Sequence, residues 1–392
     1  MTRITGHWLH EASTQQVLAL LETAGFQALF VGGCVRNALL ETDVSDVDLS
    51  TDALPEQVIE LAKAAGLHAI PTGVDHGTIT VVAGGIPHEI TTFRKDVETD
   101  GRRAVVAYTS RIEEDALRRD FTMNALYADR HGTLIDPLNG LADLRARRVR
   151  FIENAEARIR EDYLRILRFF RFYAWYGDPL NGLDADGLAA CAKLSEGLES
   201  LSKERIGAEL RKLLAAPDPA PAVASMAAAG CLSRVLPGAD PRALPLLVDL
   251  EASVGVLPDA VRRLSVLGGK DEAALLRLSK RDARSLQQIR DHVSASQGAA
   301  ELAYRHGPDM AHDILLARAA LMQQPLPAGL EADIAQGAKA KFPVTSADLA
   351  GVLSGPALGA RMKTLEDAWI ASGFSLDRAA LLASPDRPTP RA

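Results

Sequence analysis

The chain has 392 residues, of which 47% are hydrophobic and 24% charged, and its formal net charge is −7 at pH 7. These values are ordinary for a chain that buries a core, and the length predicts two or three domains. No apolar stretch approaches the length of a membrane span, the first ten residues lack a signal-peptide core, and the three cysteines show no Cys-x-x-Cys spacing. We therefore expect a cytoplasmic protein with no membrane partner, no disulfide framework and no zinc knuckle.

Residues 1–145 mix helical and extended patterns, which predicts a head of helices around a small mixed sheet. The expected helices cover residues 14–24, 36–41 and 56–65. The expected strands cover residues 27–31, 47–49, 77–82 and 88–93. A turn at 83–87 joins the last two strands as a hairpin.

A Gly-Gly turn precedes two alternating carboxylates in this head. Gly32 and Gly33 follow the first expected strand, and Asp46-Val47-Asp48 follows the next helix. In an extended strand Asp46 and Asp48 share one face and Val47 points to the core. Paired carboxylates repel unless a cation lies between them, and Mg²⁺ prefers oxygen ligands together with substrate phosphates. Because glycine lets backbone amides approach phosphate oxygens, the combination predicts a nucleoside triphosphate held against a divalent metal, although either half alone is usually an ordinary turn.

Glu89 lies in the strand expected at 88–93. Two-metal phosphoryl transfer commonly uses a third carboxylate, and a strand beside that of Asp46 and Asp48 would supply it. A lone glutamate is weak evidence by itself. The polar segment 94–103 is long for a connection, and we interpret it as either a mobile working loop or a disordered one.

A second polar cluster begins at Arg118-Arg119-Asp120, with Asn124 four residues beyond Asp120. Guanidinium groups fork onto triphosphate oxygens better than ammonium groups do. On a helix, Asp120 and Asn124 would share one face, where they would orient a ribose or the arginines. The alternative is a capped surface helix with routine charges.

The segment 145–171 is locally basic in an acidic chain, with nine arginines against four acidic residues. We expect a stripe that faces phosphate, and the alternative is a solvated helix with i,i+4 ion pairs.

Within that segment Glu161, Asp162 and Arg165 are spaced to share one face of a helix, and Arg168 follows as a further candidate contact. A carboxylate beside a guanidinium offers an acceptor beside a donor, which matches the exocyclic amine and ring nitrogen of cytosine and adenine. Uracil and guanine present the reverse pattern. Asp162 and Arg165 would thus accept C and A and reject U and G, because a mismatch leaves buried polar groups unpaired. The plain alternative is an intrahelical salt bridge.

From about residue 154 onward the extended patterns stop, and proline-containing breaks separate Ala-, Leu- and Arg-rich helices. We expect a head over 1–145, a helical neck over 146–216 and a helical body and tail over 217–392. Three prolines in residues 384–392 predict disorder there. The sequence carries no indication of an oligomeric state.

Together these motifs resemble the tRNA nucleotidyltransferase / poly(A) polymerase family, in its bacterial and eukaryotic class of CCA-adding enzymes. The resemblance covers about residues 29–214. Gly32, Gly33 and Arg36 with Asp46 and Asp48 resemble the metal and triphosphate motif, and Glu89 occupies the third-carboxylate position. Four further segments resemble the ribose-selecting motif, the hinge, the base-templating helix and the motif that closes the neck: 118–125, 136–144, 161–165 and 202–210.

The resemblance implies an α+β nucleotidyltransferase head followed by an all-α neck, body and tail. It implies template-independent addition of C, C and A to the tRNA 3′ end from CTP and ATP with release of pyrophosphate, Mg²⁺ as cofactor, and tRNA binding by residues 217–392. Asp46, Asp48 and Glu89 would be catalytic, the two aspartates holding the metal. The nucleotide-binding residues would be Gly32, Gly33, Arg36, Arg118, Arg119, Asp120, Asn124, Glu161, Asp162, Arg165 and Arg168.

One residue departs from the family's pattern. Asn37 stands where aspartate usually follows Arg36. Asparagine keeps the hydrogen-bonding shape and loses a charge, so we expect reorientation of Arg36 at most.

Three rival functions remain. Poly(A) polymerases typically carry a glycine, two basic residues and phenylalanine after the first motif, and segment 71–78 lacks that pattern. Enzymes that add only CC tend to lack part of the polar loop, which is intact at 94–103, and an enzyme that adds only A is the other partial activity. A non-catalytic RNA-binding protein with a decayed head is disfavoured by the intact Asp46 and Asp48.

Overall fold

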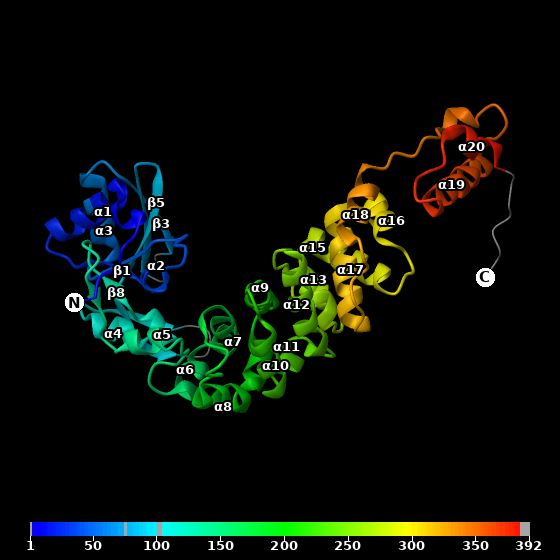
Figure 1. Cartoon of the computed structure of the whole chain (residues 1–392). Helices are drawn as coiled ribbons and strands as arrows, with labels where there is room; N and C mark the ends of the chain where they lie inside the picture. Colours follow the sequence, from blue (N-terminus) through cyan, green and yellow to red (C-terminus); the bar gives the residue numbers. More distant parts are fainter. Residues whose placement is uncertain (1, 74–76, 100–103, 385–392) are drawn as a thin grey trace. The chain divides into compact units, whose positions relative to one another are not determined.

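A computed structural model of the chain describes residues 2–73, 77–99 and 104–384 (Figure 1). It divides the chain into two compact units. The first comprises Met1–Pro241 and Gly269–Arg277, and the second comprises Arg242–Gly268 and Leu278–Ala392. The finer division at residues 145 and 216 stays a prediction. Most of the segment expected to be disordered, 384–392, lies outside the described residues, as do 74–76 of segment 71–78 and 100–103 of the expected polar loop.

The head is built on a seven-stranded mixed sheet in the order β3-β4-β5-β2-β1-β8-β9. The neighbours β2 and β5 run parallel, and the other neighbouring strands run antiparallel. The strands are β1 (Ala28–Val31), β2 (Asp48–Thr51), β3 (His68–Gly73), β4 (Thr78–Ala83), β5 (Ile86–Thr92), β8 (Tyr127–Ala128) and β9 (Leu134–Ile135). The predicted hairpin is confirmed, because Ala83 pairs with Ile86 across the turn.

Helices of the head cover the sheet and carry its connections. α1 (Ala12–Thr23) packs on β1, β4 and β5, and α3 (Pro55–Ala64) packs on β3 and β4. The remaining elements are α2 (Gly33–Leu39), α4 (Ile112–Leu117), α5 (Gly140–Arg145) and the short 3₁₀ segments η1 (His7–His10) and η3 (Thr122–Asn124). These positions confirm the three predicted helices to within a few residues.

Two local expectations about the head were wrong. The segment expected as a loop at 94–103 begins with strand β6 (Arg94–Thr99), which pairs antiparallel with β7 (Ala104–Tyr108) in a separate two-stranded sheet. β2 begins at Asp48, so Asp46 lies in the extended segment before the strand. Val47 is only half-buried there, because it lies ahead of the strand residues that enter the core.

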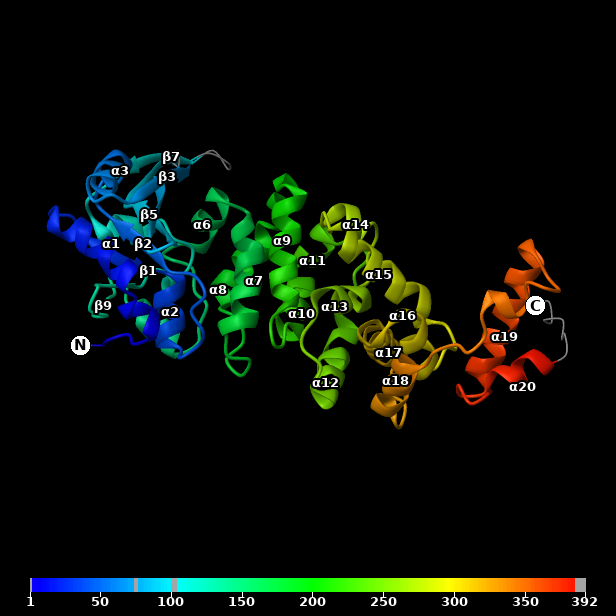
Figure 2. The same ribbon diagram turned by 90° about the horizontal axis from the view of Figure 1, so that it is seen from above.

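The neck helices follow the head within the first unit, and no strand follows β9 in the described part of the chain (Figure 2). Asn154, Asp184 and Ser202 cap the helices that follow them by accepting a hydrogen bond from a backbone N–H three residues on. The three capped helices are α6 (Ala155–Glu161), α8 (Ala185–Lys193) and α9 (Lys203–Leu214). The other elements of the unit after the head are α7 (Leu164–Tyr176), η4 (Ser195–Ser200), α10 (Ala220–Ala228), α11 (Cys231–Val235) and α14 (Glu272–Leu275).

Aromatic packing joins the neck to the head. The ring of Phe121, in the head, lies 4.9 Å from Phe151, 6.3 Å from Phe169 and 5.1 Å from Phe172, measured between centroids. Phe169 and Phe172 belong to α7, which also packs against α9 and α10. Burial of several aromatic rings contributes substantially to holding α7 against the head, because each removes a large apolar area from water.

All secondary-structure elements in the described residues of the second unit are helices. Its interior contains a charge cluster in which Glu251 accepts hydrogen bonds from Arg262 and Arg263, and Arg262 also bonds Asp313. Its elements are α12 (Leu244–Val254), α13 (Ala260–Leu267), α15 (Lys280–Val293), α16 (Ala299–His306), α17 (Pro308–Met322), α18 (Leu330–Lys339), η6 (Ser346–Asp348), α19 (Gly355–Ala371) and α20 (Arg378–Ala383), and η5 (Pro241–Ala243) begins it. Over the described residues, no helix combines the length and apolar character needed to cross a bilayer.

Candidate active site

Three carboxylates meet where β2 begins. Asp48 pairs in register with Glu89 across the parallel β2–β5 ladder, so their side chains leave the sheet on the same face. Asp46 lies two residues before Asp48, where its Oδ2 accepts a hydrogen bond from Ser45 at 2.9 Å. Partial desolvation of the Asp48 carboxylate, together with the charges of Glu89 and Asp46, raises its pKa, and Arg119 partly offsets this effect. The site therefore concentrates negative charge that a cation would stabilise.

The donor set fits a metal shared with a substrate. Among the described residues, no three His, Cys, Asp or Glu side chains are placed to hold one ion together. Asp46 and Asp48 thus offer two carboxylates, and Glu89 stands beside them. Mg²⁺ commonly binds through one or two carboxylates and fills its other positions with water and substrate phosphate. A pair of hard oxygen ligands is consistent with that mode.

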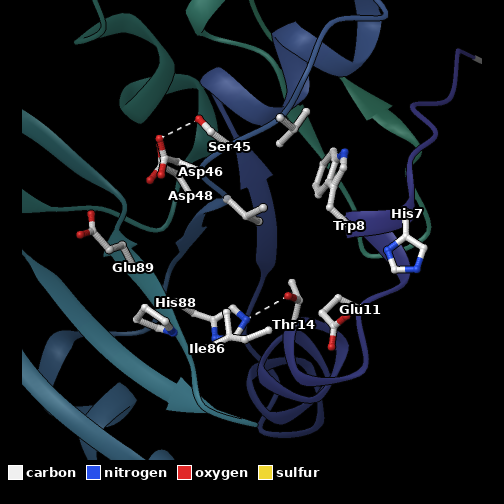
Figure 3. Close-up of a pocket in the computed structure, with 13 residues that line it drawn as sticks. His7, Trp8, Glu11, Thr14, Ser45, Asp46, Asp48, Ile86, His88 and Glu89 are labelled. Carbon is white, nitrogen blue, oxygen red and sulfur yellow. Dashed lines mark hydrogen bonds between the residues drawn. The ribbon is translucent and has the colours of Figure 1, made fainter. Parts of the chain in front are cut away.

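Beside these carboxylates lies a pocket of about 900 Å³. Figure 3 shows Asp46, Asp48 and Glu89 along one side of it and His7, Trp8 and Glu11 across from them. Val47 lines this pocket instead of entering the core. The contribution of the N-terminal segment was missed, because nothing in the sequence marks η1 as a neighbour of β2.

The Gly-Gly turn connects β1 to α2. Gly32 has a φ of 70°, a conformation that glycine adopts without steric cost, and its N–H donates to the carbonyl of Leu126. A Cβ on Gly32 would lie 3.6 Å from Nη1 of Arg119. Gly32 and Gly33 therefore bring a bare stretch of backbone close to the Arg119 guanidinium.

Asp115 holds both arginines of the second cluster. It is fully buried, and it accepts hydrogen bonds from Arg118 Nε at 2.8 Å, Arg119 Nη2 at 2.9 Å and the Tyr127 hydroxyl at 2.7 Å. Burial alone would raise the pKa of Asp115, but the two guanidiniums hold it well below its usual range. Asp115, on α4, was not among the predicted site residues, although its spacing of three and four residues from Arg118 and Arg119 was a usable indication.

Arg36 lies at the junction of head and neck and is 7% exposed. Its Nη1 donates to Asn124 Oδ1 at 2.5 Å, and its Nη2 donates to the Tyr176 hydroxyl at 2.8 Å and to Asn37 Oδ1 at 2.9 Å. The guanidinium also lies 4.1 Å from the centroid of the Tyr176 ring. Tyr176 belongs to α7, so Arg36 fastens α2 of the head to the neck.

Asp120 makes a second connection between head and neck. It is 7% exposed, and its Oδ2 accepts from Arg168 Nε at 2.7 Å while its Oδ1 accepts from Asn124 Nδ2 at 2.9 Å. Burial would raise its pKa, but the positive charge of Arg168 together with the hydrogen bonds from Asn124 and Arg168 lowers it. The expected helix over 120–124 was wrong, because only the 3₁₀ turn η3 (Thr122–Asn124) forms there, yet Asp120 and Asn124 still lie together and bond each other.

The expected continuous helix through Glu161, Asp162 and Arg165 was also wrong. α6 ends at Glu161, Asp162 has an extended backbone (φ −156°, ψ 107°), and α7 starts at Leu164. Arg165 bonds Glu161 and donates to the Arg118 carbonyl at 3.0 Å. Asp162 accepts from Arg205 Nη2 on α9 at 2.6 Å.

The basic segment 145–171 is largely neutralised by acidic neighbours. Six of its nine arginines form ion pairs, which favours the alternative interpretation over a phosphate-facing stripe. The pairs are Arg150–Asp143, Arg158–Glu161, Arg160–Glu156, Arg165–Glu161, Arg168–Asp120 and Arg171–Glu209. Arg145, Arg147 and Arg148 are exposed, and none of them has a carboxylate partner among the described residues.

The chain is similar in sequence to known families and proteins. Residues 28–150 match the family profile described as "Poly A polymerase head domain", and residues 183–242 match "Probable RNA and SrmB- binding site of polymerase A". The mouse protein "CCA tRNA nucleotidyltransferase 1, mitochondrial" is 34% identical over 379 residues, which are 90% of this chain and 85% of that protein. The "CCA-adding enzyme" of Geobacillus thermodenitrificans is 41% identical over 229 residues, 57% of this chain and 55% of that one.

A solved structure extends the likeness to three dimensions. The crystal structure of the Bacillus stearothermophilus CCA-adding enzyme in complex with CTP has a TM-score of 0.69 and 27% sequence identity. The match covers 92% of this chain and 93% of that one.

The Asp120–Arg168 pair predicts a pH-dependent contribution to stability. Asp120→Asn should lower the free energy of unfolding by about 2 kcal/mol at pH 7, because a charged hydrogen bond is replaced by a weaker one. Since the folded-state pKa of Asp120 is lowered, this contribution is fully present above the unfolded pKa of about 4, declines below it, and is lost as the pH falls through the folded-state pKa. Thermal or urea unfolding at pH 7, 5 and 3 measures the difference in the free energy of unfolding between parent and variant, called the gap below.

We expect that gap to narrow by about 1 kcal/mol between pH 5 and pH 3. Asp249→Asn, at an exposed position of α12 outside its first turn, is the control, and its free energy of unfolding should match that of the parent at each pH. A gap for Asp120→Asn that stays constant to pH 3 would contradict the ion pair.

Proposed function

The chain belongs to the tRNA nucleotidyltransferase / poly(A) polymerase family, among its CCA-adding enzymes, and we propose that the site around Asp46 and Asp48 is its active centre. It is a nucleotidyltransferase that adds C, C and A to the 3′ end of tRNA from CTP and ATP, without a template and with release of pyrophosphate. The likeness to the mouse enzyme carries this conclusion, since it extends over 85% of that protein and so includes helical parts as well as the head.

Nucleotidyl transfer in this family uses a divalent metal ion, and we assign it as Mg²⁺ on Asp46 and Asp48. When bound there, Mg²⁺ lowers the pKa of the RNA 3′-hydroxyl and stabilises the charge of the leaving pyrophosphate. Glu89 keeps further negative charge beside Asp48 and so favours occupancy by a cation. The raised pKa of Asp48 is the expected property of a carboxylate placed among like charges.

We assign the triphosphate to the side of the site that carries Gly32, Gly33 and the two arginines held by Asp115. Arg119 already acts on the charge of Asp48, so a phosphate between them would meet both the metal and a guanidinium. The side chains of Arg118 and Arg119 are 15% and 17% exposed. Their ion pairs with Asp115 fix the direction of both guanidinium groups before a substrate binds.

Arg36, Asp120 and Asn124 take positioning roles in this proposal. Four of the five N–H groups of Arg36 are bonded within the protein, which leaves little to offer a triphosphate. Asp120 and Asn124 are buried against Arg168 and Arg36. They hold the neck at a fixed distance from the carboxylates of β2.

Base selection is proposed for Asp162 and Arg165, beside Glu161. Arg165 is held by Glu161 and by the carbonyls of Arg158 and Arg118, which orients its guanidinium. Asp162 Oδ2 keeps lone-pair capacity beyond its bond from Arg205. A fixed donor beside a carboxylate acceptor matches C and A and leaves U and G with unpaired groups.

The cytoplasm is the proposed location, although the mouse relative is mitochondrial by name. Fractionation of cells that carry a tagged full-length chain would test it, and recovery in an organelle fraction would contradict it.

The metal assignment predicts the effect of two single substitutions. Asp46→Asn or Asp48→Asn should leave the melting temperature nearly unchanged, because both side chains are exposed, and should remove almost all CTP incorporation. Incorporation is measured on tRNA lacking its 3′ CCA with Mg²⁺ as the only metal. Asp52→Asn is the matched control. Asp52 is a carboxylate just beyond β2 that accepts a hydrogen bond from the Gln27 N–H and lies outside the proposed metal site. Activity within about tenfold of the parent in both variants would contradict the assignment, since loss of a metal ligand costs far more.

Base selection by Asp162 and Arg165 predicts a change in specificity. Asp162→Ala and Arg165→Ala should each lower CTP and ATP incorporation by about 10- to 100-fold and relax the rejection of UTP and GTP, because each leaves about 1–3 kcal/mol of pairing unmet. Single-nucleotide incorporation rates measure both effects. Arg205→Ala is the comparison variant. If Arg205→Ala relaxes the rejection of UTP and GTP and Arg165→Ala does not, Arg205 is the donor to the base instead of Arg165.

The unpaired arginines predict the origin of salt-dependent RNA binding. Since Arg147 and Arg148 are exposed, the double variant Arg147→Ala/Arg148→Ala should reduce the slope of log affinity against log salt by about 1–2. Arg160→Ala removes an arginine that is already paired with Glu156, so its slope should match the parent. Titration of labelled tRNA over a range of KCl concentrations measures the slopes. A reduced slope in Arg160→Ala and an unchanged slope in Arg147→Ala/Arg148→Ala would instead support the phosphate-facing stripe.

A further inference from the structure

Asn37 is bonded on both sides of its side-chain amide. It follows Arg36 in α2, and its Oδ1 accepts from Arg36 Nε at 3.1 Å and Nη2 at 2.9 Å. Its Nδ2 donates to the backbone carbonyl of Asp43 at 2.9 Å. Its own carbonyl accepts from the Thr42 N–H at 3.0 Å. One residue therefore joins the Arg36 guanidinium to the segment that leads into Asp46.

The segment 43–46 has few other attachments. It has no regular secondary structure, and three of its four residues are exposed. Within the described residues, the Asn37 amide makes the single hydrogen bond that reaches the backbone of 43–46 from elsewhere in the chain. The hydroxyl of Ser45 bonds the neighbouring Asp46 and so does not anchor the segment. The conformation ahead of Asp46 thus depends on Asn37.

The other side of this connection is rigid. Arg36 is buried and is held by Asn124 in the head and Tyr176 in the neck. Its position is therefore set by packing and hydrogen bonds that do not involve 43–46. Asn37 carries that fixed position over to the exposed segment.

We propose that Asn37 is a positioning residue whose amide holds segment 43–46 and thereby sets where the Asp46 carboxylate lies for metal binding. This inference rests on the proposed function, because it presupposes that Asp46 is a metal ligand. A fixed segment binds an ion more tightly than a mobile one, since less conformational freedom is lost on binding.

The connection needs an amide, because Asn37 must accept on one side and donate on the other. Aspartate would still accept from Arg36, but it would place an oxygen without a proton against the Asp43 carbonyl oxygen. Alanine would lose both contacts. The two replacements therefore separate a role toward Arg36 from a role toward segment 43–46.

The test measures metal binding without turnover. Asn37→Asp, Asn37→Ala and the parent are titrated with Mn²⁺ alone, without nucleotide or RNA, and free Mn²⁺ is followed by electron paramagnetic resonance. We expect both variants to bind Mn²⁺ about 5- to 10-fold more weakly. An added carboxylate would by itself strengthen cation binding, so weaker binding by Asn37→Asp isolates the lost contact with Asp43.

Amide hydrogen exchange of the metal-free protein supplies the second measurement. Exchange over 43–47 should be faster in both variants, and kcat should approach that of the parent at saturating Mg²⁺. Asn181→Asp is the control, because Asn181 also donates a surface hydrogen bond, to Asp178 in the neck, and it should change neither measurement.

Mn²⁺ affinity and exchange equal to the parent in Asn37→Asp would overturn the inference, and a change confined to Asn37→Ala would show that only the contact with Arg36 matters. Asp46→Asn is titrated in parallel. If it also binds Mn²⁺ like the parent, the metal assignment itself fails, and that failure is distinguishable from a failure of the role of Asn37.

Discussion

A continuous set of buried and partly buried hydrogen bonds between head and neck is the constraint on which the site depends. Arg168 bonds Asp120, Asp120 bonds Asn124, Asn124 bonds Arg36, and Arg36 bonds Tyr176. Removing one member leaves a buried charge or polar group without its partner, which costs more than the bond contributes when intact. The network therefore fixes the distance between the carboxylates of β2 and the helices proposed to read the base.

Charge is separated sharply around this network. Acidic side chains lie where β2 begins and at Glu89 in the middle of β5, and arginines of the head are held by a buried aspartate. Asp115 is the clearest case, since one fully buried carboxylate orients two guanidiniums. Such preorganisation suits a reaction in which charge moves between a triphosphate and a departing pyrophosphate, because little of the protein must rearrange. The acidic net charge of the chain hides this local separation.

Sequence patterns within one secondary-structure element were predictable. Helix breaks and ion pairs that depend on residues distant in the sequence were not. The hairpin β4–β5 followed from local sequence. The break at Asp162 did not, because i,i+3 and i,i+4 spacing continues through it and its partner Arg205 lies 43 residues further on. The pairing of Arg171 in the basic segment was not predictable for the same reason, since its carboxylate partner, Glu209, comes from another helix. The register of Asp48 with Glu89 depends on a parallel pairing that periodicity cannot reveal.

We propose that one site of this enzyme reads two bases in a fixed order at the tRNA end. It is tested most directly by incubating tRNA that lacks its 3′ end with CTP alone, ATP alone and both nucleotides, and resolving the products at single-nucleotide resolution. We expect two added nucleotides with CTP alone, essentially none with ATP alone, and three with both. A ladder of many adenosines with ATP alone, or addition that stops after CC when both nucleotides are present, would contradict it.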